Sequence, residues 1–330
     1  MRRSRIIGVG RYLPPRVVTN QELEQYMDTS DEWIRERSGI EERHWVDAET
    51  TTSDLAYQAS IAALDNANIN AEEIDFIILG CLMSDFFFPG AGVMLQNKLG
   101  LKHIGALDVR NQCSGFIYSL SIADQFIRTG MYNRILVVGA EIHSKGMDLS
   151  TRGRDLSVLF GDGAGAVIME ATDEDRGVLS THLHSDGSQA EHLCLKRPGT
   201  ATARFISEET YTSGEYFPYM NGREVFKNAV VRFNEVINEA LIANNIQPED
   251  IKLVIPHQAN KRISEAVAHR LKLPKGTVFS NIEKYGNTTA ASIPIALSEA
   301  LEQGLIQNND LIILAAFGSG FTWASAAIKW

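Results

Sequence analysis

The sequence has the composition of an ordinary globular protein, with 330 residues of which 44% are hydrophobic and 22% charged. That length allows one large or two medium domains with a sizeable core. The formal net charge of -10 argues against non-specific binding to nucleic acid, but it does not exclude a local basic patch. No apolar stretch approaches a membrane span, and the apolar segment near the amino terminus is broken at Gly8 and Gly10, unlike a signal peptide.

The three cysteines, Cys81, Cys113 and Cys194, show no CxxC spacing. Disulfides and a zinc site are therefore poor interpretations, and a reducing cytoplasm is the predicted compartment. A free cysteine is most often a buried structural residue, which is the role we expect for Cys81 and Cys194. His182 and His184 would share one face of a strand, but without a surrounding ligand set they predict no metal site.

An internal repeat is the first sign of organisation. Two segments match at a constant offset of 177 residues (240 minus 63), and their matched positions are Ala63, Leu64, Asn68, Ile69, Glu72, Ile74 and Ile78 with Ala240, Leu241, Asn245, Ile246, Glu249, Ile251 and Ile255. Each copy reads as the end of an amphipathic helix, a polar turn and an apolar strand, at Ile74 to Leu79 and at Ile251 to Ile255. The chain is thus predicted to use one supersecondary plan twice.

The repeat resumes at an offset of 174 residues (287 minus 113), pairing Cys113 with Asn287 and Gly130 with Gly304 around two further helices. Continuous apolar runs of the kind found in buried strands follow in each half, and a glycine turn with another strand closes it. The predicted buried strands are 135–138 and 311–314, and each glycine turn with its closing strand spans 160–170 or 317–330. Two βαβ-rich halves predict an α/β protein with two mixed sheets, and with helices between and outside them.

The longest irregular region runs roughly from Ser185 to Asn221. It is rich in Gly, Pro, Ser and Thr, and it carries four aromatic residues, Tyr211, Tyr216, Phe217 and Tyr219. This composition favours an ordered functional loop over disorder. We expect it to cover a site.

Cys113 is the candidate nucleophile. It lies in the segment Asn111-Gln112-Cys113-Ser114-Gly115, directly before a predicted helix whose positive end would stabilise a thiolate. The small neighbours Ser114 and Gly115 would let a substrate carbonyl approach. The alternative is a buried structural cysteine, which is the commoner fate of a free cysteine.

His257 and Asn287 are its candidate partners. His257 follows a buried strand directly, and Asn287 precedes a predicted helix. Taken alone, His257 would be a satisfied structural residue and Asn287 a helix N-cap. Strand ends of an open α/β sheet bring distant residues together, however. A Cys with a His and an Asn suits acyl-thioester chemistry, in which a thiolate attacks and two neutral donors stabilise an enolate-like oxygen.

Two glycine-rich turns invite functional interpretations. The first, Phe317-Gly318-Ser319-Gly320-Phe321, offers backbone N–H groups that could form an oxyanion hole with the N–H of Cys113; otherwise it is a turn between strands. The second, Gly161-Asp162-Gly163-Ala164-Gly165, lacks the spacing of a phosphate-binding loop. We interpret the second as close backbone packing.

These motifs together resemble the bacterial β-ketoacyl-acyl-carrier-protein synthase III family, and the likeness covers nearly the whole chain. The segments that carry it are Ile6-Ile7-Gly8, Asp28 to Ile34, Arg37-Ser38-Gly39-Ile40, Asp108-Val109, Phe160 to Gly165, His257-Gln258-Ala259-Asn260, Gly286-Asn287-Thr288 and Gly320-Phe321-Thr322-Trp323. The resemblance implies a thiolase-like α/β fold whose two duplicated halves, residues 1–175 with Cys113 and 176–330 with His257 and Asn287, form a five-layered α-β-α-β-α core.

The resemblance also implies a mechanism in two stages. Cys113 takes an acyl group from coenzyme A, and the acyl-enzyme then receives a carbanion from malonyl-ACP as carbon dioxide leaves. His257 and Asn287 would hold the malonyl thioester carbonyl, while the N–H groups of Cys113 and Ser319 would hold the acyl oxygen. The thioesters are substrates, and no metal or other cofactor is implied.

The same carry-over assigns residues to substrate binding. Trp33 would stack on the adenine of coenzyme A, Arg37 and Arg152 would line the entrance, and Asn260 would contact pantetheine. A tryptophan between charged residues fits stacking, although a partly buried structural tryptophan is the alternative. Because the acyl carrier protein is acidic, an acidic enzyme needs a local basic face. Candidates for this docking face are Lys227, Lys261, Arg262, Arg270 and Lys272. The alternative is that these residues form only a solvated helix face.

The apolar run Phe86-Phe87-Phe88-Pro89 lies in a predicted loop. Core packing is one interpretation. The resemblance implies instead a homodimer in which Phe88 reaches toward the partner's acyl pocket.

Several positions depart from the family pattern and border the substrate channel. Arg110-Asn111-Gln112 precede the cysteine where small alanines are typical, and Ser319 and Ala324 replace glycines. The primer therefore stays open among acetyl, branched and medium-chain acyl groups. Three other functions also stay open: an acyltransferase of secondary metabolism, a head-to-head condensing enzyme, for which Asp85 is the nearby acid, and a non-catalytic thiolase-fold subunit.

Overall fold

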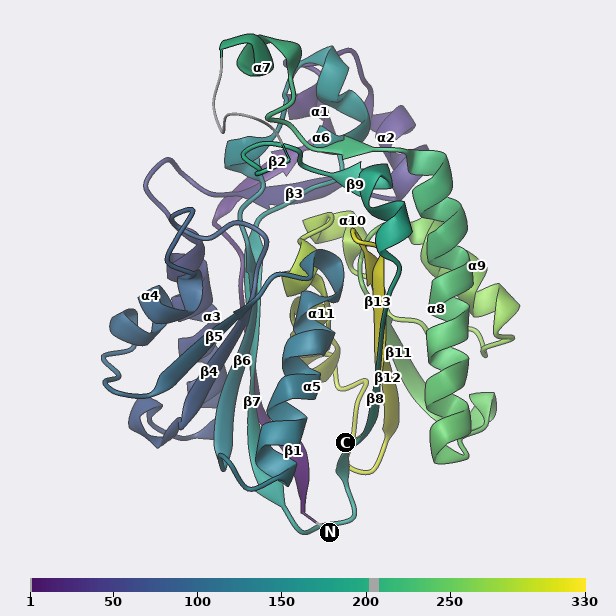
Figure 1. Ribbon diagram of the computed structural model, residues 1–330. Coiled ribbons are helices and arrows are strands. Elements are labelled where there is room, and N and C mark those ends of the chain that lie inside the picture. The colour runs from purple at the N-terminus through teal and green to yellow at the C-terminus, as the bar shows by residue number, and fades with distance from the viewer. Residues whose placement is uncertain (1, 202–207) are drawn as a thin grey trace.

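Two mixed β-sheets form the framework of the protein, seen here in a computed structural model that describes residues 2–201 and 208–330 (Figure 1). The first sheet has the strand order β1-β7-β6-β4-β5, and the second has the order β11-β12-β13-β8. The strands of the first are β1 (Arg3–Tyr12), β4 (Phe76–Gly80), β5 (Gly105–Val109), β6 (Arg134–Glu141) and β7 (Gly163–Thr172). Those of the second are β8 (Gly177–Ser185), β11 (Ile251–Pro256), β12 (Leu311–Gly318) and β13 (Thr322–Lys329). Parallel and antiparallel pairs occur in both sheets, as predicted.

Helices cover both faces of each sheet and give five layers (Figure 1). On the outer side of the first sheet lie α3 (Thr52–Ala67) and α4 (Ala91–Lys98), and on the outer side of the second lie α8 (Gly222–Asn244) and α9 (Lys261–Arg270). Between the sheets lie α5 (Gly115–Arg128) and α11 (Ser292–Glu302), whose apolar side chains are buried nearly all round because both neighbours are sheets. This is the predicted α-β-α-β-α core.

Shorter elements are grouped above the ends of the sheets, at the top of Figure 1. They include β2 (Arg16–Thr19), β3 (Glu42–Trp45), α1 (Asn20–Leu23), α2 (Asp31–Ser38), α6 (Arg154–Ser157) and α10 (Ile282–Tyr285). Ser30 caps α2, accepting the N–H of Trp33 at 3.1 Å. Among the described residues, no helix combines the length and the apolar character that a membrane crossing requires.

The sequence repeat corresponds to a repeated turn in the structure. Asn68 is the C-cap of α3 with a φ of 53°, and Asn245 is the C-cap of α8 with a φ of 54°, both in the left-handed region that asparagine tolerates better than most residues. Each turn continues through a single 3-10 turn into a strand, β4 or β11. The matching asparagines therefore end the two helices in the same way.

The glycine-rich segment after Phe160 leads into β7. A glycine turn followed by a strand is predicted over 160–170, and β7 begins inside that range, at Gly163. Gly161 and Asp162 bond outside the sheet: the N–H of Gly161 donates to the carbonyl of Asn287 at 3.1 Å, and that of Asp162 donates to the carbonyl of His44 at 2.8 Å. This turn ties the start of β7 to Asn287.

The irregular region between Ser185 and Asn221 contains some regular structure. It forms β9 (Leu193–Cys194), α7 (Glu208–Ser213) and β10 (Tyr219–Met220), and β9 pairs with β10. Residues 202–207 and the side chain of Tyr211 lie outside the described part of the chain. Phe217 and Tyr219 line a pocket of about 200 Å³ that Arg152 also lines.

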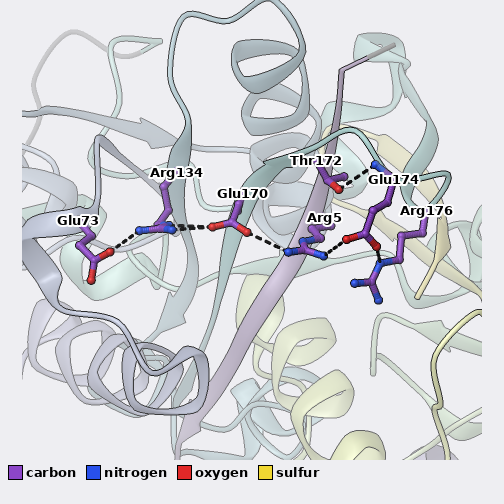
Figure 2. A network of polar contacts seen from close by, with 7 residues as sticks. All are labelled: Arg5, Glu73, Arg134, Glu170, Thr172, Glu174 and Arg176. Atoms are coloured by element: carbon purple, nitrogen blue, oxygen red, sulfur yellow. Dashed lines mark hydrogen bonds and ion pairs between the residues drawn. The ribbon is translucent and has the colours of Figure 1, made fainter.

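A ladder of ion pairs runs across neighbouring strands at one end of the first sheet (Figure 2). Arg134 on β6 contacts Glu73 at 2.7 Å and Glu170 on β7 at 2.6 Å, and Arg5 on β1 continues the ladder to Glu170 at 3.2 Å and Glu174 at 2.9 Å. Hydrogen bonding to Glu170 raises the pKa of Arg134. The ladder joins strands that are distant in sequence at the end of the sheet opposite the short elements.

Candidate active site

Cys113 lies in a 3-10 turn, η2 (Gln112–Ser114), between β5 and α5. It is buried, and the chain before it is bent at Gln112, which has a φ of 42°. Gly318, at the end of β12, lies so close that a Cβ atom there would be 2.5 Å from the Cβ of Cys113 and 2.9 Å from its Sγ. The end of β12 thus forms one wall around the thiol.

The expectation of a ready thiolate is not supported by the surroundings of Cys113. Burial, and after it the Glu141 carboxyl, raise the pKa of the Cys113 thiol to about 12, although hydrogen bonds from the backbone N–H groups of Ser319 and Cys113 act to lower it. The helix start favours a thiolate, but removing the sulfur from water outweighs it. Cys113 therefore rests as a thiol, and the backbone N–H groups of Cys113 and Ser319 are directed at its sulfur.

His257 lies directly after β11, where the sequence placed it, and is buried. Its Nδ1 atom is 2.6 Å from Oγ of Ser292, the first residue of α11, while its Nε2 atom is buried without a partner among the described residues. Burial lowers the pKa of His257 to about 3, with a further contribution from His143. The ring is therefore neutral at ordinary pH.

Asn287 is fixed by its own backbone and by the turn that follows it. Its N–H donates to the carbonyl of Leu159 at 2.8 Å, and its side-chain Oδ1 accepts the N–H of Thr289 at 2.9 Å. Among the described residues, the one side-chain hydrogen bond of Asn287 is this contact at Oδ1, which leaves Nδ2 available as a donor. Asn287 is not a helix N-cap, because the N-cap residues of the two helical elements that follow it are Thr288 and Ala291. Its side-chain oxygen instead closes a short turn with Thr289.

The segments that carry Cys113, His257 and Asn287 meet near η7 (Thr289–Ala291), the 3-10 turn that leads into α11. The turn that carries Cys113 packs against both η7 and β12, and Ser292, which holds His257, comes directly after η7. The structure therefore brings Cys113, His257 and Asn287 to one place, at the ends of strands from both sheets.

Sequence reasoning missed two polar residues at the end of β6. The Glu141 carboxylate accepts the N–H of Leu82 at 3.0 and 3.1 Å, and burial raises its pKa to about 8. His143 has its Nε2 atom 2.7 Å from Oγ1 of Thr289. Both lie at or just beyond the end of an apolar strand, which is the signal that identified His257.

The residues predicted to bind coenzyme A lie near one another. The guanidinium groups of Arg37 and Arg154 both lie over the ring of Trp33, each 4.7 Å from its centroid. Arg152 instead contacts Asp148 at 2.6 Å and lies over the ring of Phe217 at 5.5 Å. Arg154 is thus a contact of Trp33 that the sequence did not identify.

Asn260 acts as the N-cap of α9, where its Oδ1 accepts the N–H of Arg262 at 2.9 Å. Its Nδ2 donates to the carbonyl of Arg37 at 2.8 Å, so it links α9 to α2. Its side chain therefore already has partners, and the predicted contact with pantetheine stays a prediction.

The predicted docking and dimer residues are on the surface. Lys227 on α8 and Lys261, Arg262 and Arg270 on α9 are exposed, and none forms an ion pair within residues 2–201 and 208–330. Phe88 is 81% exposed, and Phe86 and Phe87 are also exposed, so the core-packing interpretation of this loop is wrong.

Comparison with known proteins agrees with this architecture. The family model for the 3-oxoacyl-ACP synthase III family matches residues 107–187, and the model for its C-terminal part matches residues 241–330. A β-ketoacyl-ACP synthase III from Xanthomonas campestris is 48% identical over 99% of this chain and 98% of its own length. One from Caldanaerobacter subterraneus is 45% identical over 98% of this chain and 97% of its own length.

Solved structures extend the comparison to the fold. The crystal structure of 3-oxoacyl-ACP synthase III from Aquifex aeolicus has a TM-score of 0.91 and 43% identity, covering 99% of this chain and 100% of that one. A variant of Xanthomonas campestris OleA, with a TM-score of 0.84 and 20% identity over 99% of this chain and 98% of that one, shows a shared fold alone. The fold is thus that of the thiolase-like condensing enzymes. Within this class, the chain belongs to the 3-oxoacyl-ACP synthase III family, also called β-ketoacyl-ACP synthase III.

Proposed function

We propose that this chain carries out its family's reaction, the decarboxylating condensation of an acyl-CoA primer with malonyl-ACP to give 3-ketoacyl-ACP, through an acyl group on Cys113. The family is one of acyltransferases that initiate fatty acid synthesis, and identities of 45–48% over nearly the whole chain favour this reaction over the alternatives considered above. The observation that carries the assignment of residues is the buried, unpartnered Nε2 of His257, together with an Asn287 amide whose Oδ1 is already held by Thr289.

In the first stage, Sγ of Cys113 attacks the thioester carbonyl of acyl-CoA. The bond from carbon to the coenzyme A sulfur breaks, and the thiol proton ends on the departing coenzyme A. The developing oxyanion would accept the N–H groups of Cys113 and Ser319, which are directed at the sulfur. Attack must be coupled to loss of the proton, because burial disfavours a free thiolate.

In the second stage, His257 Nε2 and Asn287 Nδ2 would donate to the malonyl thioester oxygen. The bond to the carboxylate breaks, carbon dioxide leaves, and the electron pair passes into an enolate that these donors stabilise. The enolate carbon then attacks the acyl carbon on Cys113, and the cysteine sulfur departs and regains a proton. Two neutral donors suit this step, and the low pKa of His257 keeps its ring neutral.

The substrate contacts in this proposal follow the surface just described. Trp33, Arg37, Arg152 and Asn260 would receive coenzyme A and pantetheine, and Lys227, Lys261, Arg262 and Arg270 would receive the acidic carrier protein. The unpaired state of the four basic residues within the described ranges supports the second assignment, because an exposed cation without a partner adds to a positive field.

The assembly and location are part of the same proposal. A homodimer with Phe88 reaching the partner's acyl pocket would cover the exposed Phe86–Phe88 loop. We further propose a cytoplasmic enzyme without a metal or other cofactor, made of two halves at 1–175 and 176–330. The free state of Cys81, Cys113 and Cys194 supports the reducing compartment.

Intact-protein mass spectrometry tests the proposal. The protein is mixed with straight and branched acyl-CoAs of different lengths and then chased with malonyl-ACP. An adduct on Cys113 that disappears as 3-ketoacyl-ACP forms is expected, and its mass identifies the primer. An adduct that persists would indicate an acyltransferase of another kind, and no adduct with any thioester would contradict enzymatic acylation altogether.

A further inference from the structure

His143 is a partly buried polar group of the site that the proposed mechanism does not use. It lies two residues beyond β6, and its backbone N–H donates to Oδ1 of Asp162 at 2.7 Å. The neighbouring N–H of Ser144 donates to the same oxygen at 2.9 Å. The imidazole packs against the ring of Phe160, with centroids 4.5 Å apart. Backbone and ring are thus held from two sides, so the direction of Nε2 is set.

The Nε2 atom of His143 points to Oγ1 of Thr289, 2.7 Å away. Thr289 has a φ of 50°, in the left-handed region that a β-branched residue rarely adopts. A strained conformation of this kind persists only where its surroundings hold it. In this position the backbone N–H of Thr289 donates to Oδ1 of Asn287 at 2.9 Å. One residue therefore links the imidazole to the catalytic amide.

The link decides which way the Asn287 amide faces. Since Oδ1 accepts the N–H of Thr289, Nδ2 must lie on the other side of the amide, free to donate to a substrate. If Thr289 relaxed to an ordinary φ, its N–H would turn away and the amide could rotate. The hydroxyl contact to His143 resists that relaxation from the side-chain end.

We propose that His143 is a positioning residue for the decarboxylation step: through Thr289 it holds the Asn287 amide with Nδ2 directed at the malonyl thioester oxygen. This inference rests on the proposed function, and it deepens the assignment of Asn287. Burial lowers the pKa of His143 to about 4, so the ring that contacts Thr289 is neutral. A neutral ring also adds no positive charge to the site.

The test separates the two half-reactions. Self-acylation of Cys113 by acyl-CoA is followed by intact mass, and decarboxylation is followed as labelled carbon dioxide released from malonyl-ACP. We expect His143→Leu to leave self-acylation within about twofold and to slow decarboxylation by about 10- to 100-fold, the cost of misplacing one donor. His143→Gln, which can still reach Thr289, should recover much of the rate.

A double-mutant cycle distinguishes positioning from a merely structural role. In the Asn287→Ala protein there is no amide to position, so adding His143→Leu should change decarboxylation by less than about twofold. Thr289→Val tests the link from its other side while keeping the side-chain shape. Thr289→Val should slow decarboxylation as much as His143→Leu does. Thr129→Val is the control and should have no effect, because the exposed Thr129 hydroxyl bonds only to carbonyls of α5.

Two results would overturn the inference: unchanged decarboxylation in His143→Leu, or the same loss from His143→Leu with and without Asn287. Failure of the proposed function would look different. In that case the wild-type protein itself would neither acquire an acyl adduct on Cys113 nor decarboxylate malonyl-ACP.

Discussion

Nδ1 of His257 lies 2.6 Å from Oγ of Ser292, and the same oxygen lies 3.3 Å from the backbone N–H of Gln258. If the serine oxygen accepts the N–H of Gln258, its own proton is free to go to Nδ1 of His257. A neutral imidazole that accepts at Nδ1 carries its proton on Nε2. This tautomer, which the proposed mechanism requires, would make the unpartnered Nε2 a donor for the substrate.

Replacement of Ser292 by alanine tests this relationship. Loss of the hydrogen bond frees the ring to rotate and to change tautomer, so Ser292→Ala should slow malonyl-ACP decarboxylation by about tenfold, equivalent to roughly 1.4 kcal/mol. The rate is measured as released carbon dioxide. Ser60→Ala is the matched control, because Ser60 is also buried and its hydroxyl donates only to the carbonyl of Ala56. Equal rates in the two variants would refute the assignment.

A methyl group at Gly318 should disable Cys113. The added Cβ would meet the Cβ and Sγ of Cys113 at 2.5 and 2.9 Å, closer than atoms can remain, so the thiol must move. We expect Gly318→Ala to slow self-acylation by about 100-fold or more, since an ångström of displacement at a reacting atom has that effect. The measurement is the rate of adduct formation by mass spectrometry.

Gly187 provides the control, because a Cβ there would have no atom within 4 Å. Gly187→Ala should acylate at the wild-type rate. Normal acylation in Gly318→Ala would show that the end of β12 yields easily and does not define the position of the nucleophile.

Acid should destabilise the protein through His257. Its pKa is lowered to about 3 in the folded state, against about 6.5 in an unfolded chain. Between these pH values the unfolded chain binds a proton at His257 that the folded protein does not. The contribution of neutral His257 to the free energy of unfolding is therefore complete above pH 6.5 and is lost as pH falls. By pH 5 the loss should be about 2 kcal/mol.

Glu141 changes the stability of the fold in the opposite direction as pH falls, so the experiment must separate its contribution from that of His257. The pKa of Glu141 is raised to about 8, so its contribution grows as pH falls from that value. The quantity to measure is therefore the difference in urea-unfolding free energy between wild type and His257→Gln, at about pH 7.5 and pH 5. The variant should lose less stability on acidification. If the difference were the same at both pH values, the folded protein would bind a proton at His257 as readily as the unfolded chain does.

The sequence allowed the main features of the fold and site to be predicted because they depend on local patterns. Apolar runs marked the strands, and the matching positions around Asn68 and Asn245 marked a turn that the chain uses twice. Cys113, His257 and Asn287 were found because each follows or precedes an element whose end could be read. Their convergence follows from the topology of the two sheets.

The parts that were not predicted depend on three-dimensional surroundings. The raised pKa of Cys113 comes from burial and from Glu141, 28 residues along the chain (141 minus 113), and neither effect is visible in a helix-start motif. The left-handed φ of Thr289 contradicts the preference of its residue type and occurs together with contacts to His143 and Asn287. The contact of Arg154 with Trp33 was not predicted, because the family resemblance assigned Arg152 to the entrance.

Trp33 should matter for coenzyme A and not for the carrier protein. Its ring already lies against the guanidinium groups of Arg37 and Arg154, which shows that its faces accept planar groups. Stacking of a base on an aromatic ring contributes about 1–3 kcal/mol, so Trp33→Ala should raise the KM for acyl-CoA by about 5- to 100-fold. Trp33→Phe, which keeps a ring, should raise it less.

The carrier protein provides the internal control for Trp33. Malonyl-ACP presents pantetheine without adenine, so its KM and the rate of decarboxylation should be unchanged in Trp33→Ala. Steady-state kinetics with each substrate varied in turn gives both values. If the KM for malonyl-ACP rose as much as that for acyl-CoA, the tryptophan would act by holding α2 in place, because loss of that helix would affect both substrates alike.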